Sequence, residues 1–204
     1  MNGGTFVVPG GSTPHMFYQY LAHSVKVWSD TTLILSDERL VDEGLPESNM
    51  GMIKNQLIDQ ITASEKPNLL PVINGYSPVQ TNKIVDALNL NAIPFMPPQA
   101  AFLGIGTDGH TASLFPDSKD NLTEKDPFII VERISEPFKR VSLSATVLTQ
   151  TPALFFLVNG KEKQQIVDHI LKASSNDLEL PVQFIINNSV ADVVLLCDHQ
   201  AAPK

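Results

Sequence analysis

Cysteine is almost absent from this chain, since Cys197 is the only one among 204 residues. A single thiol excludes an internal disulfide and provides no cysteine cluster for zinc. No carboxylate and histidine residues occur at the spacing of a metal site either, so the sequence predicts no metal. This composition is typical of a cytoplasmic protein, and we expect that compartment.

Basic residues are also few, with 14 lysines and arginines against 22 acidic residues and a net charge of −8. Binding to a nucleic-acid backbone needs a basic face, so this balance disfavours nucleic acid as a partner. A small anion is still compatible with an acidic chain. It needs only two or three local cations and a few N–H groups that point at it.

Long apolar runs are missing, and no stretch approaches the roughly 18 residues that a membrane helix needs. The first residues, MNGGT, carry no basic segment followed by an apolar one, so we expect no secretory signal and no membrane partner. Apolar residues make up 43% and charged residues 18% of the chain, which is a globular balance. The length predicts one domain, residues 1–204. No feature of the sequence predicts an oligomeric state.

One pattern recurs although there is no true internal repeat: a short apolar run, a turn with glycine, and a stretch compatible with a helix. It occurs at residues 6–14 (FVVPGGSTP), 102–110 (FLGIGTDGH) and 155–163 (FFLVNGKEK), and with less glycine at 32–39 (TLILSDER). Continuous apolar strands that alternate with helices indicate an α/β fold with a parallel sheet covered on both faces. The turns after such strands share one edge of the sheet, where ligands bind, so the four runs could converge there.

Helices are expected between these runs. Thr13 can cap a helix that has Pro14 at its first position, and Ser48 can cap another. The apolar residues of the second helix recur on one face: Met50, Ile53, Leu57 and Ile61. A further helix is expected at residues 161–171 and a last strand at 190–196, while Cys197 is expected in the core.

The turn at residues 10–14 has the composition of a phosphate site. Gly11 lets the backbone approach a ligand closely, the following helix start offers free N–H groups, and Ser12 and Thr13 add hydroxyl groups. An ordinary tight turn with a capped helix explains the same residues equally well.

Cations stand at three further places. Arg39 ends a run of three charges, residues 37–39, which by itself is more typical of a solvated turn. Arg140 precedes an alternating run at residues 141–147. Lys163 lies in the first turn of a helix, against the helix dipole, which a bound anion would explain; Lys161 is a competing candidate.

The run at residues 104–109 fits the dinucleotide pattern GxGxxG, but the surroundings do not. Pro116 would end the helix after little more than a turn, and Glu124 lies in a polar stretch instead of at a strand end. A catalytic role explains the end of this run, residues 108–110 (DGH), better than nucleotide binding does. His110 on a glycine turn can act as a general base near neutral pH, and Asp108 can orient its ring or bind a substrate hydroxyl. A histidine with purely local hydrogen bonds is the alternative.

Residues 103–116 (LGIGTDGHTASLFP) closely resemble the signature of 6-phosphogluconolactonases. Four more blocks resemble that family in the same order: GGSTP at 10–14, DER at 37–39 with SN at 48–49, RVSLS at 140–144 and FLVNGKEK at 156–163. The resemblance implies a Rossmann-like three-layer α/β sandwich with a mainly parallel sheet, a fold shared with glucosamine-6-phosphate deaminases. It implies no cofactor.

The implied activity is hydrolysis of 6-phospho-D-glucono-1,5-lactone, in the oxidative branch of the pentose phosphate pathway. In that resemblance His110 is the base that activates water, with Asp108 beside it. The family positions that hold the phosphate match the turn with Gly11, Ser12 and Thr13, together with Arg140 and Lys163. Arg39 matches a position that lines the same pocket. The donors to the oxyanion stay open between backbone N–H groups of the glycine turn and Arg39.

Two departures from the family pattern lead to further expectations. Only nine residues precede Gly10, where members usually carry a helix and a strand, so we expect a shortened N-terminal edge element. Deaminases carry a glutamate where this chain has Phe115, and Asp-Glu-Tyr where it has residues 37–39, which favours the lactonase. A sugar-phosphate-binding protein without activity is the alternative from another class, but it would have no need for His110.

Overall fold

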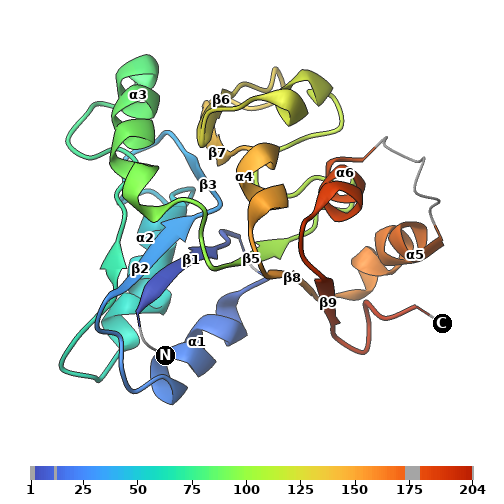
Figure 1. The fold of residues 1–204 in the computed structure, drawn as a ribbon, viewed down its shortest axis with the longest axis horizontal. Coiled ribbons are helices and arrows are strands. Elements are labelled where there is room, and N and C mark those ends of the chain that lie inside the picture. Colours follow the sequence, from blue (N-terminus) through green and yellow to red (C-terminus); the bar gives the residue numbers. More distant parts are fainter. Residues whose placement is uncertain (1–2, 12, 173–179, 204) are drawn as a thin grey trace.

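Six parallel strands form the centre of the molecule (Figure 1). The computed structural model describes residues 3–11, 13–172 and 180–203, apart from the side chains of residues 119 and 120. In this part of the chain the strands of the central sheet have the order β4-β2-β1-β5-β8-β9. The strands are β1 (Gly4–Val8), β2 (Thr31–Leu35), β4 (Asn68–Leu69), β5 (Ala100–Gly104), β8 (Leu154–Val158) and β9 (Val193–Cys197). Every neighbouring pair is parallel, which confirms the predicted sheet.

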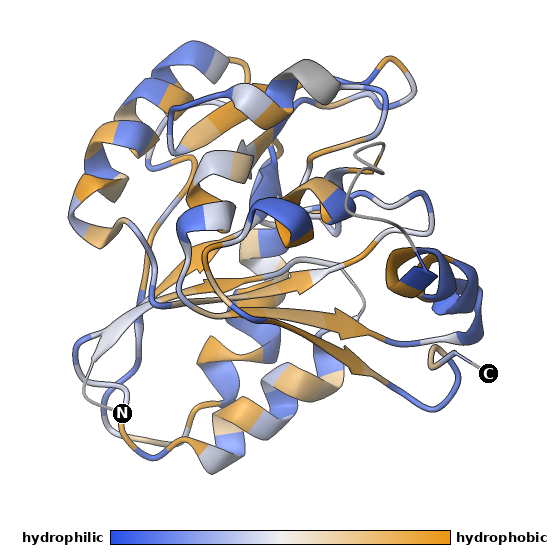
Figure 2. Cartoon of the chain, turned by 45° about the vertical axis from the view of Figure 1, so that its right-hand side comes forward, coloured by the Kyte–Doolittle hydropathy of each residue, from blue (hydrophilic) through white to orange (hydrophobic). Residues whose placement is uncertain are grey.

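Helices lie on both faces of this sheet (Figure 2). The α-helices are α1 (His15–Ser24), α2 (Asn49–Gln56), α3 (Thr81–Ala92), α4 (Ala145–Gln150), α5 (Gln164–Lys172) and α6 (Pro181–Asn188). Short 3₁₀ helices are η1 (Ile58–Gln60), η2 (Ile93–Phe95), η3 (Lys119–Thr123) and η4 (Lys161–Lys163). Helix α1 contacts α2, and α4 contacts α6 across the sheet from them. The three-layer α/β architecture is as expected.

A second, antiparallel sheet with the order β3-β7-β6 lies beside the first. It consists of β3 (Asp37–Arg39), β6 (Phe128–Val131) and β7 (Arg140–Leu143). Strand β3 follows β2 after a single residue, Ser36, so the two sheets are joined at the carboxyl edge of the parallel one. This second sheet carries Asp37 and Arg140 to the edge where the parallel strands end.

Apolar burial explains why the strands are so uniformly hydrophobic. All five residues of β2 are buried, and Val7, Leu103, Leu154 and Phe156 at the centre of the sheet have no exposed surface. Each such side chain contributes roughly 1.5–3 kcal/mol when it leaves water. The described helices include none that is long and apolar enough to cross a membrane.

Several local predictions differ from the structure. Helix α1 begins at His15 behind Pro14, and the side chain of Thr13 does not cap it. The run at 141–147 alternates in sequence but not in burial, because β7 is the middle strand of its sheet and is buried throughout, and Ser144 then caps α4. No helix follows residues 104–109, where a turn leads to a bridge between Thr111 and Leu114.

Other local predictions hold. Ser48 caps α2 and accepts a hydrogen bond from the N–H group of Gly51 at 3.1 Å. The four apolar residues predicted on its inner face are buried, although α2 ends at Gln56 and two of them lie beyond it: Met50, Ile53, Leu57 and Ile61. The helix expected at 161–171 is η4 followed by α5, and the last strand begins at Val193 instead of residue 190. Cys197 is half-buried and packs against the core.

Candidate active site

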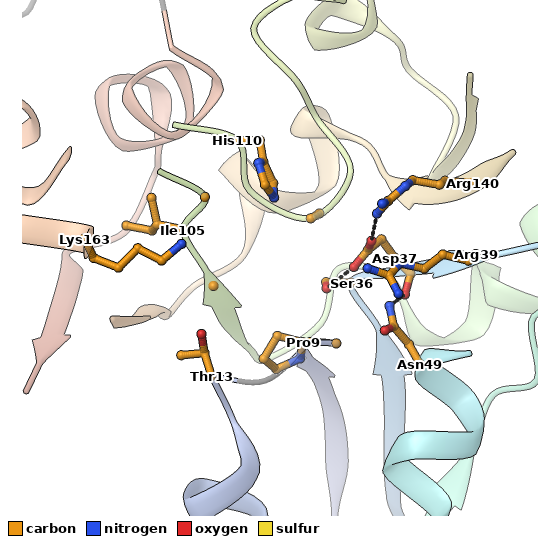
Figure 3. A pocket seen from close by; sticks show the side chains of 15 residues that line it. Pro9, Thr13, Ser36, Asp37, Arg39, Asn49, Ile105, His110, Arg140 and Lys163 are labelled. Atoms are coloured by element: carbon orange, nitrogen blue, oxygen red, sulfur yellow. Dashed lines mark hydrogen bonds and ion pairs between the residues drawn. The ribbon is translucent and has the colours of Figure 1, made fainter. Parts of the chain in front are cut away.

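A pocket of about 190 Å³ opens at the carboxyl edge of the parallel sheet, where β1, β2, β5 and β8 end. It brings together residues that are far apart in sequence: Gly11, Thr13, Arg39, His110, Arg140 and Lys163. Figure 3 shows the His110 ring, the Lys163 side chain and Thr13 facing the same space from different elements. Ser12, which was predicted beside them, lies outside the described residues. The convergence follows from the topology, because parallel strands end at a common edge.

Asp108 is not a lining residue of this pocket, but it is paired with His110, which is. The Oδ1 atom of Asp108 lies 2.5 Å from Nδ1 of His110 and also accepts a hydrogen bond from the His110 backbone N–H at 3.2 Å. Burial would raise the pKa of Asp108. The charge of His110 and the hydrogen bonds from it outweigh that effect, so the pKa lies below its ordinary value. A carboxylate at Nδ1 leaves Nε2 as the ring nitrogen for chemistry.

The turn that presents this pair is held by its own backbone. The N–H group of Gly106 donates to the His110 carbonyl at 2.8 Å, and that of Gly109 donates to the Gly106 carbonyl at 3.0 Å. Gly109 has a φ of +83°, a left-handed conformation that favours glycine. The Thr111 hydroxyl donates to the carbonyl of Gly104 at 2.9 Å and ties the turn to β5. These contacts fix the direction of the His110 side chain.

Phe115 packs against the His110 ring. It is 1% exposed, and the centres of the two rings are 4.6 Å apart. The guanidinium carbon of Arg133 lies 4.0 Å from the centre of the same phenyl ring, within the range of a cation–π contact. The position next to His110 is therefore closed by an apolar ring.

Arg140 is buried in a network of carboxylates and hydroxyls. Its Nε and Nη2 atoms lie 2.8 and 2.7 Å from Oε2 of Glu136. Nη1 lies 3.6 Å from Oδ2 of Asp37 and donates to the Ser113 hydroxyl at 3.3 Å, and Ser113 in turn donates to Asp37 at 2.6 Å. Neither Asp37 nor Glu136 was predicted as a partner of Arg140. Glu136 lies in the loop between β6 and β7, where sequence spacing gives no signal.

The solvated turn favoured for residues 37–39 is wrong. Glu38 is 1% exposed and accepts hydrogen bonds from the backbone N–H groups of Arg39, Asn49 and Met50 and from the Ser48 hydroxyl, at 2.7–3.1 Å. Burial raises the pKa of Glu38, and these hydrogen bonds oppose the rise. The carboxylate thus binds the start of α2, where free N–H groups favour an anion.

Asn49 at the start of α2 also lines the pocket, and its Nδ2 donates to the carbonyl of Asp37 at 2.9 Å. Arg39 faces the pocket from β3. Its Nη1 donates to the carbonyl of Glu47 at 2.8 Å, while its buried Nε has no hydrogen-bond partner among the described residues.

Lys163 completes the pocket from η4, which begins directly after Gly160, two residues beyond the end of β8. Burial lowers its pKa, and the negative charges of Glu162 and Asp108 oppose that effect. Lys161 is exposed and does not line the pocket, so the geometry separates the two candidates that the residues alone left open. No group of three or more His, Cys, Asp or Glu side chains in the described part of the chain is placed to hold a metal ion.

A family model described as glucosamine-6-phosphate isomerases/6-phosphogluconolactonase matches residues 3–195. The chain belongs to this family. A 6-phosphogluconolactonase of Helicobacter pylori (strain J99) is 31% identical over 182 residues, which cover 88% of this chain and 77% of the relative. One of Synechocystis is 30% identical over 205 residues, covering 97% and 83% of the two chains.

Solved structures share the fold. A 6-phosphogluconolactonase from Shewanella baltica has a TM-score of 0.82 at 24% identity and covers 96% of this chain and 83% of its own. A monomeric glucosamine-6-phosphate deaminase has a TM-score of 0.75 at 16% identity and covers 98% and 88%. Both branches of the family therefore share this architecture, and the choice between them depends on the pocket.

Proposed function

We propose that this chain hydrolyses 6-phospho-D-glucono-1,5-lactone to 6-phosphogluconate, with His110 as the general base. The observation that carries the proposal is the pair of Asp108 and His110 at a pocket that also holds Lys163, Arg39 and Arg140. The pair provides a base, and the cations provide sites for an anionic substrate. The relatives from Helicobacter pylori and Synechocystis bear the name of this activity, and this chain matches each of them over most of its length.

The reaction needs few groups because a lactone is an ester. Asp108 accepts the hydrogen bond of the His110 Nδ1–H group and fixes the tautomer in which Nε2 is free. Nε2 removes a proton from water while the water oxygen attacks the lactone carbonyl carbon. The bond between that carbon and the ring oxygen then breaks, and His110 returns the proton to the ring oxygen. Water is consumed, and the product is the open-chain acid.

The phosphate is assigned to the other loops of the pocket. Lys163 supplies a positive charge, Thr13 a hydroxyl and the turn at Gly11 its backbone, while Arg140 contributes from β7. Ser12 stays a prediction of the resemblance. Arg39, which lines the pocket, and backbone N–H groups of the glycine turn both stay candidates for the oxyanion donor.

Phe115 is the reason to prefer hydrolysis over deamination. The resemblance implies a glutamate at this position in the deaminases, for ring opening. Here the position holds a phenyl ring, 1% exposed, packed on His110. Position 115 therefore provides no carboxylate for ring opening. A role in the oxidative pentose phosphate pathway, in the cytoplasm, follows from the proposed reaction and from the composition.

Two assays of the purified chain separate the candidates. The first follows hydrolysis of freshly generated 6-phosphogluconolactone, with the spontaneous rate subtracted; the second measures ammonia release from glucosamine-6-phosphate. Acceleration in the first and none in the second is expected. Ammonia release would select the deaminase, and saturable binding of 6-phosphogluconate without either activity would select a binding protein.

A further inference from the structure

Gly106 lies in the turn after β5, beside the pair of Asp108 and His110. A methyl group built on its Cα would overlap Nδ1 of His110 and would lie 2.5 Å from Oδ1 of Asp108. These are the two atoms that form the 2.5 Å contact of the pair. The space that glycine leaves empty is therefore the space in which the pair forms.

Backbone conformation is not the reason for glycine at this position. The described glycines in the left-handed region are Gly11, Gly75, Gly109 and Gly160, and Gly106 is not among them. Gly106 does not need the left-handed conformation, and the three atoms nearest to an added methyl group all belong to side chains with rotatable bonds. The ring of His110 or the carboxylate of Asp108 would turn away, and the backbone hydrogen bonds of the turn could persist.

The other glycines of this turn differ from Gly106. A methyl group on Gly104 would meet no atom within 4 Å. Gly109 has a φ of +83°, and a methyl group there would meet the side chain of Leu180 instead of the pair. Of the three glycines in the GxGxxG pattern, Gly106 is thus the one whose missing side chain leaves space for the pair.

We propose that Gly106 is a positioning residue, whose missing side chain allows Asp108 to hold Nδ1 of His110. The effect on activity rests on the proposed function, whereas the effect on the pair does not. In a Gly106→Ala variant the Nδ1–H group loses its acceptor. The neutral ring then changes toward the Nε2–H tautomer, in which the nitrogen assigned to the water carries a proton.

The direct test is ¹⁵N NMR of histidine-labelled protein, with His110 assigned by comparison with His110→Ala. In its neutral form the His110 ring of the wild type is expected to show the Nδ1–H tautomer, and that of Gly106→Ala the Nε2–H tautomer or a mixture. Gly104→Ala is the matched control for the tautomer, because its methyl group meets open space. The lactonase rate of Gly106→Ala is expected to fall about tenfold or more, the loss typical of a base held in the wrong state. An unchanged tautomer in Gly106→Ala would overturn the proposal.

A double variant keeps the test valid if Gly106→Ala is unstable. Removing the ring removes the closest overlap and leaves room for the Asp108 carboxylate to turn away, so Gly106→Ala/His110→Ala should unfold at the same urea concentration as His110→Ala. If it unfolds as early as Gly106→Ala, the overlap is with another part of the molecule and the proposal fails. A wild type that shows the Nδ1–H tautomer without lactonase activity would overturn the proposed function alone.

Discussion

Oδ1 of Asp108 and Nδ1 of His110 lie 2.5 Å apart, and a single residue separates Asp108 from His110 in the chain. A contact between such near neighbours requires a sharply folded backbone, which the turn from Gly106 to His110 provides through its two internal hydrogen bonds. The side chains of His110 and Asp108 are 33% and 44% exposed, so the pair is open to solvent and ligand. We therefore expect the pair to determine the tautomer of the His110 ring and to contribute little to the stability of the fold.

Asp108→Asn is expected to lower kcat about tenfold or more with little change in KM. The amide can still accept from Nδ1, but a neutral acceptor gives a hydrogen bond weaker by about 1.5 kcal/mol, which is about tenfold in rate. Steady-state kinetics on the lactone measure this. Asp117→Asn, at an exposed carboxylate, is the control. A change confined to KM would instead assign Asp108 to substrate binding.

Lys163→Met is expected to weaken binding of 6-phosphogluconate by about 10- to 100-fold, the effect of one lost charge-assisted hydrogen bond. Lys161→Met removes an exposed cation two residues away and should leave affinity nearly unchanged. Titration calorimetry measures both. Gluconate, which lacks the phosphate, should not distinguish wild type from Lys163→Met, and if it does, Lys163 does not bind the phosphate.

The pH dependence of that affinity follows from the environment of Lys163. Because burial lowers the pKa of this ammonium group, it loses its proton at a lower pH than a free lysine, whose pKa is about 10.4. The advantage of wild type over Lys163→Met should therefore disappear as the pH rises through this lowered pKa. A constant ratio of affinities across the alkaline range would contradict this assignment.

Arg140→Met is expected to reduce the free energy of unfolding by about 3 kcal/mol, because it leaves the buried Asp37 carboxylate and that of Glu136 without their cation. The neighbouring Lys139 forms an exposed ion pair with Glu132, so Lys139→Met should cost about 0.5 kcal/mol or less. Urea denaturation measures both. Equal losses in the two variants would mean that the Arg140 network contributes no more than a surface pair.

Glu38→Gln tests the buried carboxylate at the start of α2. Since burial raises the pKa of Glu38, its contribution to stability is complete below the unfolded pKa of about 4.3 and declines as the pH rises through the folded pKa. The glutamine variant lacks this decline, so its stability deficit should narrow from acidic toward neutral pH. Glu47→Gln, at an exposed position, is the control. Parallel stability curves for wild type and Glu38→Gln would show that this carboxyl does not titrate with a raised pKa.

The parallel sheet and the convergence of the site were predictable, because each depends on local sequence. Continuous apolar runs identify buried strands, and parallel strands bring their following turns to one edge. The turns with Gly11, His110 and Lys163 therefore meet at the pocket as expected. Ser48 was also identifiable as a cap, since capping depends on residues within one turn.

The antiparallel sheet was not predictable in the same way. Strand β3 pairs with β7, about a hundred residues later, and three charges in a row resemble an exposed turn. Tertiary partners that the local sequence does not reveal compensate for the burial of these charges: the N–H groups at the start of α2 for Glu38, and Arg140 with Ser113 for Asp37. Thr13 was misassigned as a cap because the same residue type also suits a pocket wall.

The most direct test of the account is the lactonase rate of His110→Ala beside wild type, with freshly generated 6-phosphogluconolactone and subtraction of spontaneous hydrolysis. A general base contributes about 100- to 10,000-fold, so the variant should lose at least about 100-fold in kcat while its affinity for 6-phosphogluconate changes little. Equal rates for the two proteins would remove His110 from the mechanism and contradict the account.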